Sequence, residues 1–372
     1  RVVSAHHVYP DPLSQAAEFV SWLRAHTQEH AYALVIPVTE RTLVLLSRHR
    51  EVFSDVNIAM PAEHSLDTVL DKSKTLALAA SLDVPIPKGI PVDSLEQLSA
   101  LRASLNYPVV IKPTRSIGSN DAGSSQLQVS YAFDPIGLES GCVHALRFGS
   151  VVLQEYFKGM GVGIELIADD GEILYAFQHR RLHEVPLTGG GSSLRKSEPV
   201  HPQLLEASRK LVAALRWRGV AMVEFKLDPD TGAFCLMEIN GRFWGSLPLA
   251  ESAGADFPAM LFDLETGGEF TPYPPYKNDI SCRLLSRDLL WYESVLRGDG
   301  DQRIVDLPDK REILRSLGLM LSPRHRFDVQ SLFDPWPGIF DIGNIFESYG
   351  KRISTLMAER RFLRSQQRAW RR

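Results

Sequence analysis

Three side chains near the middle of the chain have the types and spacing of a metal-binding site. Glu224 lies in the segment VAMVEFKL, and Glu238 and Asn240 lie in FCLMEINGR. Side chains alternate faces along a strand, so Glu238 and Asn240 share one face, and a hairpin symmetric about Thr231 would place Glu224 across from Glu238. Like charges in that position are destabilising unless a cation lies between them. Carboxylate and amide oxygens predict Mg2+; the alternative is a solvated sheet face with two unrelated glutamates.

Two lysines and a glycine-bearing loop could bind phosphate groups. Lys112 follows the apolar segment VVI, and Lys72 lies in DKSK. The loop over residues 115–125 is rich in Gly and Ser, so its backbone N–H groups could close over phosphate oxygens. The alternatives are a Lys112 that extends to solvent and a loop that is an ordinary hairpin. No GxxxxGK[ST] motif occurs, and the glycines at 159, 161 and 163 precede a strand where a dinucleotide fingerprint requires a helix.

The adjacent residues Arg180 and Arg181 are candidates for binding an anionic substrate. They point to opposite faces of the predicted strand 172–181, so only one of them can face the site. A guanidinium fork suits a carboxylate or phosphate, but an exposed arginine on a sheet is also common. The triple glycine 189–191 that follows is either a mobile lid or a simple loop.

The hydrophobic pattern predicts the elements that must position these residues. In the first 62 residues, a helix from Asp11, a strand over 33–38, a helix over 40–49 and a strand over 56–60 indicate an α/β unit. A long helix over 63–82 then ends before two prolines, which marks the first domain boundary.

An antiparallel α+β body follows this boundary. It has strands over 108–111, 151–157, 163–168, 172–181, 220–228 and 233–240 and a helix over 202–217. From about residue 270 the pattern is mostly helical, and the arginine-rich end, 351–372, is predicted to be a surface helix with solvated charge.

Composition excludes several classes of protein. The chain has 372 residues, 41 basic against 45 acidic side chains and a formal net charge of −4, so it lacks the basic character expected of a nucleic-acid-binding protein. Its three cysteines are far apart and form no metal-ligand pattern, which favours a reducing, cytoplasmic setting. No apolar run approaches the roughly 20 residues that a membrane helix needs, so a membrane is not the expected partner. The charge balance likewise means that nucleic acid is not the expected partner.

The order of the motifs resembles the ATP-grasp superfamily, particularly its carboxylate-amine ligases and the biotin carboxylase and carbamoyl phosphate synthetase branch. A lysine is followed by VVIKP and a Gly/Ser loop, then by VVLQEYFKGMGVG, MVEFKL and LMEINGRFWGS, over roughly residues 60–265. The resemblance implies an α/β plus α+β chain with four parts. These are an N-terminal doubly wound domain (1–62), a small lid subdomain with the phosphate-binding loop (63–150), a large subdomain with the metal site (151–268) and a helical C-terminal extension (269–372). Relatives begin with a small doubly wound domain whose first strand carries a glycine-rich turn. Because the given sequence lacks that unit, we expect residues to be missing before Arg1.

The resemblance also implies a role for each matching residue. Lys72 and Lys112 would contact the ATP phosphates, and Ser116, Gly118 and Ser119 would belong to the lid over them. The segment Gln154, Glu155, Tyr156 and Phe157 would be the hinge, with backbone atoms of Glu155 and Phe157 on the adenine edge. Glu224, Glu238 and Asn240 would hold Mg2+, or Mn2+ as an alternative, while Arg242 would steady the transferred phosphoryl group and Arg180 or Arg181 would contact substrate. Relatives carry a ribose-binding side chain where this chain has Gly161-Val-Gly163, so the ribose contact stays unassigned.

The predicted function is an ATP-dependent ligase that activates a carboxylate as an acyl phosphate and joins it to an amine, with release of ADP and phosphate. The expected partners are therefore a small-molecule carboxylate and an amine; the substrates and any homo-oligomeric state stay open. One alternative is a carboxyphosphate-forming enzyme that activates bicarbonate, and another is an ATP-binding module without turnover.

Overall fold

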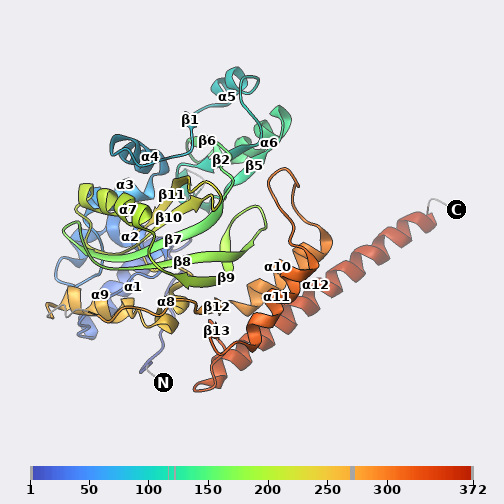
Figure 1. Cartoon of the computed structure of the whole chain (residues 1–372). Helices are drawn as coiled ribbons and strands as arrows, with labels where there is room; N and C mark the ends of the chain where they lie inside the picture. Colours follow the sequence, from blue (N-terminus) through green and yellow to red (C-terminus); the bar gives the residue numbers. More distant parts are fainter. Residues whose placement is uncertain (1–2, 116, 121–122, 269–272, 370–372) are drawn as a thin grey trace.

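A computed structural model describes residues 3–115, 117–120, 123–268 and 273–369, of which 117–120, 123–126 and 353–369 are described by their backbone alone (Figure 1). Two β-sheets and the helices that cover them form the body of the protein. The larger sheet consists of β7 (Met160–Asp169), β8 (Glu172–Val185), β9 (Gly191–Glu198), β10 (Gly219–Leu227), β11 (Phe234–Asn240), β12 (Ser281–Arg283) and β13 (His325–Phe327). Its strand order is β11-β10-β7-β8-β9-β12-β13, antiparallel except between β12 and β13. The predicted antiparallel strands are therefore confirmed.

Different helices pack against the two faces of the larger sheet. On one face, residues such as Val162 and Val223 pack against α7 (Pro202–Ala214) in the main apolar core. On the other face, Met222 belongs to the core formed with α8 (Leu247–Ala253) and α9 (Phe257–Thr266). Glu224 lies two residues beyond Met222 and so shares this second face. The second face is thus apolar beneath α8 and α9 and carries polar side chains beyond them.

The smaller sheet consists of β1 (Gly89–Val92), β2 (Val109–Pro113), β5 (Ser130–Ala132) and β6 (Val151–Glu155), in the order β1-β6-β2-β5. Val109, Ile111 and Leu153 pack into a separate apolar core with α5 (Leu95–Leu101) and α6 (Pro135–Ala145). Lys112 and Gln154 follow the apolar residues by one position and therefore lie on the opposite face. The predicted Gly/Ser loop after β2 is a hairpin in its described part, formed by β3 (Ile117–Asn120) and β4 (Gly123–Gln126).

The N-terminal part is more helical than predicted. It contains α1 (Ala16–Glu29), α2 (Glu40–Arg48), the 3-10 helix η1 (Arg50–Phe53), α3 (Glu63–Leu70) and α4 (Lys72–Ser81). The two predicted strands reduce to one parallel bridge between Val35 and Ile58. The predicted helix over 63–82 is also wrong in one respect, because it breaks at Asp71, whose carboxylate accepts hydrogen bonds from the Ser73 and Lys74 amides and caps α4.

The C-terminal extension is mostly helical, as predicted, with α10 (Leu285–Arg297), α11 (Lys310–Gly318), the 3-10 helix η2 (Leu319–Leu321) and α12 (Pro335–Ala369). Figure 1 shows α12 projecting beyond the body. The sequence pattern missed β12 and β13, because each has only three residues. These strands continue the larger sheet past residue 268, and the predicted domain boundaries remain a prediction. No helix in the described part of the chain combines the length and apolarity needed to cross a bilayer.

Two glycines in β7 let larger side chains from β8 lie across that strand. A Cβ atom on Gly163 would lie 2.3 Å from Cε1 of His179, and one on Gly161 would lie 2.7 Å from Cδ of Arg181. His179 is buried there, with its Nδ1 2.9 Å from Oε1 of Glu165. Any side chain at these two positions would therefore displace polar groups from the second face of the sheet.

Gly163→Ala is expected to destabilise the fold by about 1–3 kcal/mol, because the added methyl group overlaps the His179 ring. Gly343→Ala is the matched control, since no atom lies within 4 Å of a Cβ there and alanine favours a helix interior by about 1 kcal/mol. Thermal denaturation should show a lower Tm for Gly163→Ala and an equal or higher Tm for Gly343→Ala. An unchanged Tm for Gly163→Ala would contradict this packing.

Candidate active site

Glu224 and Glu238 occupy directly paired positions of β10 and β11, which confirms the predicted register. Asn240 lies on the same face and donates from Nδ2 to Oε1 of Glu224 at 2.9 Å and to Oε1 of Glu238 at 3.3 Å. The ladder shifts by one residue immediately after Glu224, so the symmetry about Thr231 holds only at the site end of the hairpin. The three predicted metal ligands therefore lie together.

Of the two adjacent arginines, Arg181 faces these carboxylates and Arg180 does not. Arg181 forms ion pairs with Glu224 and, at 3.2 Å, with Glu184. Arg180 instead pairs with Glu198 at 2.9 Å on the other face of β8. Although burial opposes it, the two carboxylates raise the pKa of Arg181, so its positive charge is fixed. The prediction that only one arginine faces the site is confirmed, and a site role for Arg180 is not supported by its position.

The prediction that a bound cation must separate Glu224 and Glu238 needs correction, because the protein supplies positive groups itself. Burial raises the pKa of Glu224, while Arg181 opposes that rise. The pKa of Glu238 is lowered despite its burial, because Lys72, Lys112 and Arg181 favour the charged carboxylate. The positive charges of Lys72, Lys112 and Arg181 thus reduce the repulsion between the two carboxylates. The symmetry of the hairpin alone did not predict that these side chains lie near the pair.

Lys112 extends from the smaller sheet toward Glu238 of the larger one. Its side chain is buried, and burial lowers its pKa to about 8, with Glu238 opposing the shift. Lys72 begins α4 and donates its backbone N–H to the Thr114 carbonyl at 2.8 Å, which links α4 to the end of β2. The two predicted phosphate-binding lysines therefore approach the carboxylates from two different elements.

A small cavity of about 30 Å³ lies between α2, α3, α4 and the end of β11. Its polar lining residues are Glu40, Lys72, Thr75, Glu238, Asn240 and Arg242. Arg242 donates to the Phe243 carbonyl at 2.8 Å and to Oδ1 of Asn240 at 3.4 Å. The predicted phosphoryl-steadying arginine therefore lies beside the predicted metal ligands.

Sequence analysis missed three charged residues at this site. Burial raises the pKa of Glu40, the first residue of α2, although Arg242 and Lys72 oppose the shift. Lys226 lies 3.5 Å from Glu184, and Lys226 and Arg181 lower the pKa of Glu184 despite its burial. Lys226 could have been found, because it follows Glu224 by two positions on the same strand face. Glu40 carries no such signal, since it comes from an element distant in sequence.

In the predicted hinge, the Gln154 side chain fits a nucleotide-binding role, but the Glu155 backbone N–H does not. Gln154 is 2% exposed, and neither polar atom of its amide has a hydrogen-bond partner among the described residues. The Glu155 backbone N–H, in contrast, already donates to the Lys88 carbonyl at 2.9 Å, so it is not available to adenine. A buried amide without partners fits a ligand that supplies them.

The end of the hinge contacts the C-terminal extension. The Tyr156 hydroxyl donates to the Ile304 carbonyl at 2.9 Å, and Lys158 pairs with Asp306 at 2.7 Å. The guanidinium of Arg303 lies 4.1 Å from the ring centroid of Phe133, just after β5. The Tyr156 hydroxyl is therefore engaged within the protein. The predicted backbone contact of Phe157 with adenine stays a prediction.

The remaining predicted residues belong to the hairpin after β2. Ser116 lies outside the described residues, and Gly118 and Ser119 lie in β3, where only the backbone is described. Their lid role stays a prediction. The space above Gly161 and Gly163, where no ribose contact was assigned, is filled by Arg181 and His179 from β8.

A family model described as "ATP-grasp in the biosynthetic pathway with Ter operon" matches residues 147–287, which contain the paired glutamates and Asn240. This match assigns residues 147–287 to the ATP-grasp superfamily. The chain is 23% identical over 221 residues to the carbamoyl phosphate synthase large chain of Clostridium acetobutylicum, which covers 57% of this chain and 20% of that protein. It is 22% identical over 206 residues to the N-terminal section of the Methanopyrus kandleri large chain, covering 54% and 36%. The chain thus spans well under half the length of these ATP-grasp relatives.

Solved ATP-grasp structures share the fold. The biotin carboxylase of Campylobacter jejuni, in a complex with β-γ-ATP, superposes with a TM-score of 0.57 at 16% identity, over 72% of this chain and 62% of that one. The L-amino acid ligase of Bacillus licheniformis gives 0.52 at 18% identity, over 70% and 64%. The predicted ATP-grasp fold is therefore confirmed.

Nucleotide binding by this ATP-grasp site should depend on pH through Lys112. As the pH rises above about 8, its ammonium loses a proton, so ATP affinity should fall in the wild-type protein. Lys112→Met should bind ATP about 10–100-fold more weakly at neutral pH and lose this pH dependence, because a charged hydrogen bond is removed. Calorimetric titration across this range measures both effects.

Two controls separate charge from folding. Lys112→Arg keeps its charge at every pH tested, so its ATP affinity should not fall above pH 8. Lys210→Met removes a lysine of α7 whose ammonium donates to the Leu82 carbonyl at 3.1 Å, and this variant should bind ATP as the wild type does. Equal ATP affinity in wild type and Lys112→Met would remove Lys112 from the site.

Proposed function

We propose that this protein is an ATP-dependent ligase that converts a carboxylate to an acyl phosphate and joins it to an amine. The γ-phosphoryl group leaves its bond to the β-phosphate and forms a bond to a carboxylate oxygen. The amine nitrogen then attacks the acyl carbon, phosphate departs, and the nitrogen loses a proton. The products are an amide, ADP and phosphate.

One observation carries the proposal. Glu238, which is paired with Glu224 on the larger sheet, lies within the electrostatic reach of lysines from the smaller sheet and α4. Arg242 lines a cavity together with Glu238 and Lys72. Phosphoryl transfer needs little covalent chemistry from the protein; it needs cations that hold a polyphosphate and stabilise charge in the transition state. This set of charges suits a polyphosphate with its counter-ion and would have no evident use in an apolar pocket.

The donor set fits a hard divalent cation. Glu224, Glu238 and Asn240 would hold Mg2+, which prefers carboxylate and phosphate oxygens. Asn240 now directs Nδ2 toward both carboxylates, so its amide must turn to present an oxygen instead. Bound Mg2+ would neutralise charge on the phosphates during transfer.

The chain's own residues divide the remaining work. Lys72 and Lys112 bind phosphate oxygens, and Arg242 steadies the phosphoryl group as its charge is redistributed. Arg181 is held by two carboxylates and is therefore a positioning residue for Glu224 in this scheme. Gln154 supplies a buried amide to the nucleotide base.

A second candidate function is supported by the relatives. Similarity to carbamoyl phosphate synthases and to biotin carboxylase favours bicarbonate as the acid that is phosphorylated, which would give carboxyphosphate. The L-amino acid ligase favours an organic carboxylate. Both candidates use the same phosphoryl-transfer site, so the acceptor decides between them.

Release of ADP should identify the acceptor. Purified protein with Mg2+ and ATP is incubated with amino-acid mixtures, with other acid and amine mixtures, or with bicarbonate, and products are analysed by mass spectrometry. We expect ADP formation that requires both an acid and an amine, with an amide as product. ADP release with bicarbonate alone would replace the ligase proposal by the carboxyphosphate alternative.

Glu238→Gln should abolish turnover while the fold survives. The substitution keeps the shape but removes the charged carboxylate that Lys72, Lys112 and Arg181 favour, so the protein should fold with a somewhat lower Tm without nucleotide. Loss of electrostatic stabilisation should reduce the rate about 100-fold or more. Glu198→Gln, which removes the partner of Arg180 on the other face, is the control and should retain turnover. Near-normal turnover of Glu238→Gln would rule out the metal site and the mechanism that depends on it.

A further inference from the structure

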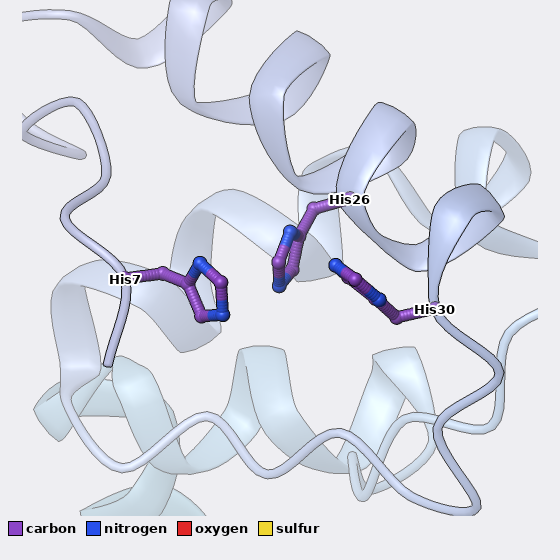
Figure 2. A group of neighbouring side chains, drawn as sticks. All are labelled: His7, His26 and His30. Atoms are coloured by element: carbon purple, nitrogen blue, oxygen red, sulfur yellow. The ribbon is translucent and has the colours of Figure 1, made fainter. Parts of the chain in front are cut away.

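Three histidines gather at the N-terminal part of the chain, outside the nucleotide site. His26 and His30 lie four residues apart at the end of α1, and His7 comes from the segment that precedes that helix. Figure 2 shows the three imidazole rings converging from these two segments. One nitrogen from each ring lies within 4.8 Å of the other two. The chain thus brings three ligands of one chemical type to one point.

The surroundings fix the central ring of this His7–His26–His30 cluster. His26 stacks on Trp22, with ring centroids 4.7 Å apart and an interplanar angle of 14°. Its Nε2 lies 2.9 Å from the Tyr32 hydroxyl. Desolvation and the neighbouring His7 and His30 rings lower the pKa of His26. Neutral imidazole is the form that binds metals.

Packing of the rings alone does not account for the cluster. The His7 and His26 ring centroids are 4.5 Å apart, and those of His26 and His30 are 4.6 Å apart, with both pairs strongly tilted. Three adjacent imidazoles would repel one another on protonation and offer less apolar surface than carbocyclic rings would. A shared cation turns the same arrangement into an attraction.

We propose that His7, His26 and His30 bind one transition-metal ion of the zinc class, with the fourth position left to water or another ligand. Imidazole selects Zn2+, Co2+, Ni2+ or Cu2+ over Mg2+. Tetrahedral ligands about 2.0–2.1 Å from zinc lie roughly 3.3 Å apart, so modest rotations of the rings would bring the nitrogens into place. His7 is exposed, which gives the ion a path from solvent.

The position of the ion suggests what it does. His26 also lines an apolar cavity of about 340 Å³ that extends from Tyr9 and Trp22 to Thr39. Thr39 caps α2, and the next residue, Glu40, lines the active-site cavity. A bound metal ion would link the segment that contains His7 to α1. It would thereby restrict the motion of the residues around His26 that line the apolar cavity. Its effect is therefore structural, and it is independent of the proposed ligase activity.

The test uses untagged full-length protein and Co2+, whose visible absorption reports the coordination geometry. A Glu238→Gln background removes the predicted magnesium site, and nucleotide is omitted. We expect one Co2+ per chain with tetrahedral bands, displacement by Zn2+, and a higher Tm in the presence of Zn2+. His26→Ala and His30→Ala should each weaken binding at least about tenfold.

Two further variants keep the result interpretable. His7→Gln changes an exposed residue outside the helices, so it should fold normally and still lose affinity for Co2+. His144→Ala removes an exposed histidine far along the chain and should bind Co2+ as the parent does. Absence of tetrahedral bands in the parent, or equal affinity in His7→Gln and the parent, would overturn the proposal.

Discussion

Glu224 and Glu238 carry like charges at paired positions of neighbouring strands, and the surrounding structure makes that pairing tolerable. Arg181 crosses β7 to reach Glu224, which is possible only because Gly161 leaves room for its side chain. The positive field on Glu238 comes from Lys112 and Lys72, which belong to other elements. The carboxylate pair therefore imposes requirements on the larger sheet, the smaller sheet and α4 at once.

Sequence patterns predicted the features that short-range periodicity determines, namely the strands and the pairing of neighbouring strands. The register of β10 and β11 follows from strand alternation and one turn, and most strands of the larger sheet follow from regular apolar runs. The order of motifs then gave the ATP-grasp fold. The split of Arg180 and Arg181 between two faces was predicted, but which of them faces inward depends on Glu184 and Glu198, whose positions only the folded sheet determines.

Features that arise from long-range contacts could not be predicted in this way. Glu40 reaches the site from a helix almost two hundred residues before Glu238, and no local pattern connects them. The break at Asp71 was missed because a capping aspartate competes with an otherwise continuous helical pattern. The two N-terminal strands shrank to one bridge because apolar runs of that length do not distinguish a strand from a buried connection. β12 and β13 are too short for any periodic signal.

The C-terminal extension joins both sheets. Its strands β12 and β13 are part of the larger sheet, while residues 303–306 contact Phe133, Tyr156 and Lys158 on the side of the smaller one. A rotation of the smaller sheet away from the larger one must therefore either break these contacts or pull the 303–306 segment with it. The extension therefore bridges the two sheets, so the free energy needed to separate them would include the cost of breaking these contacts.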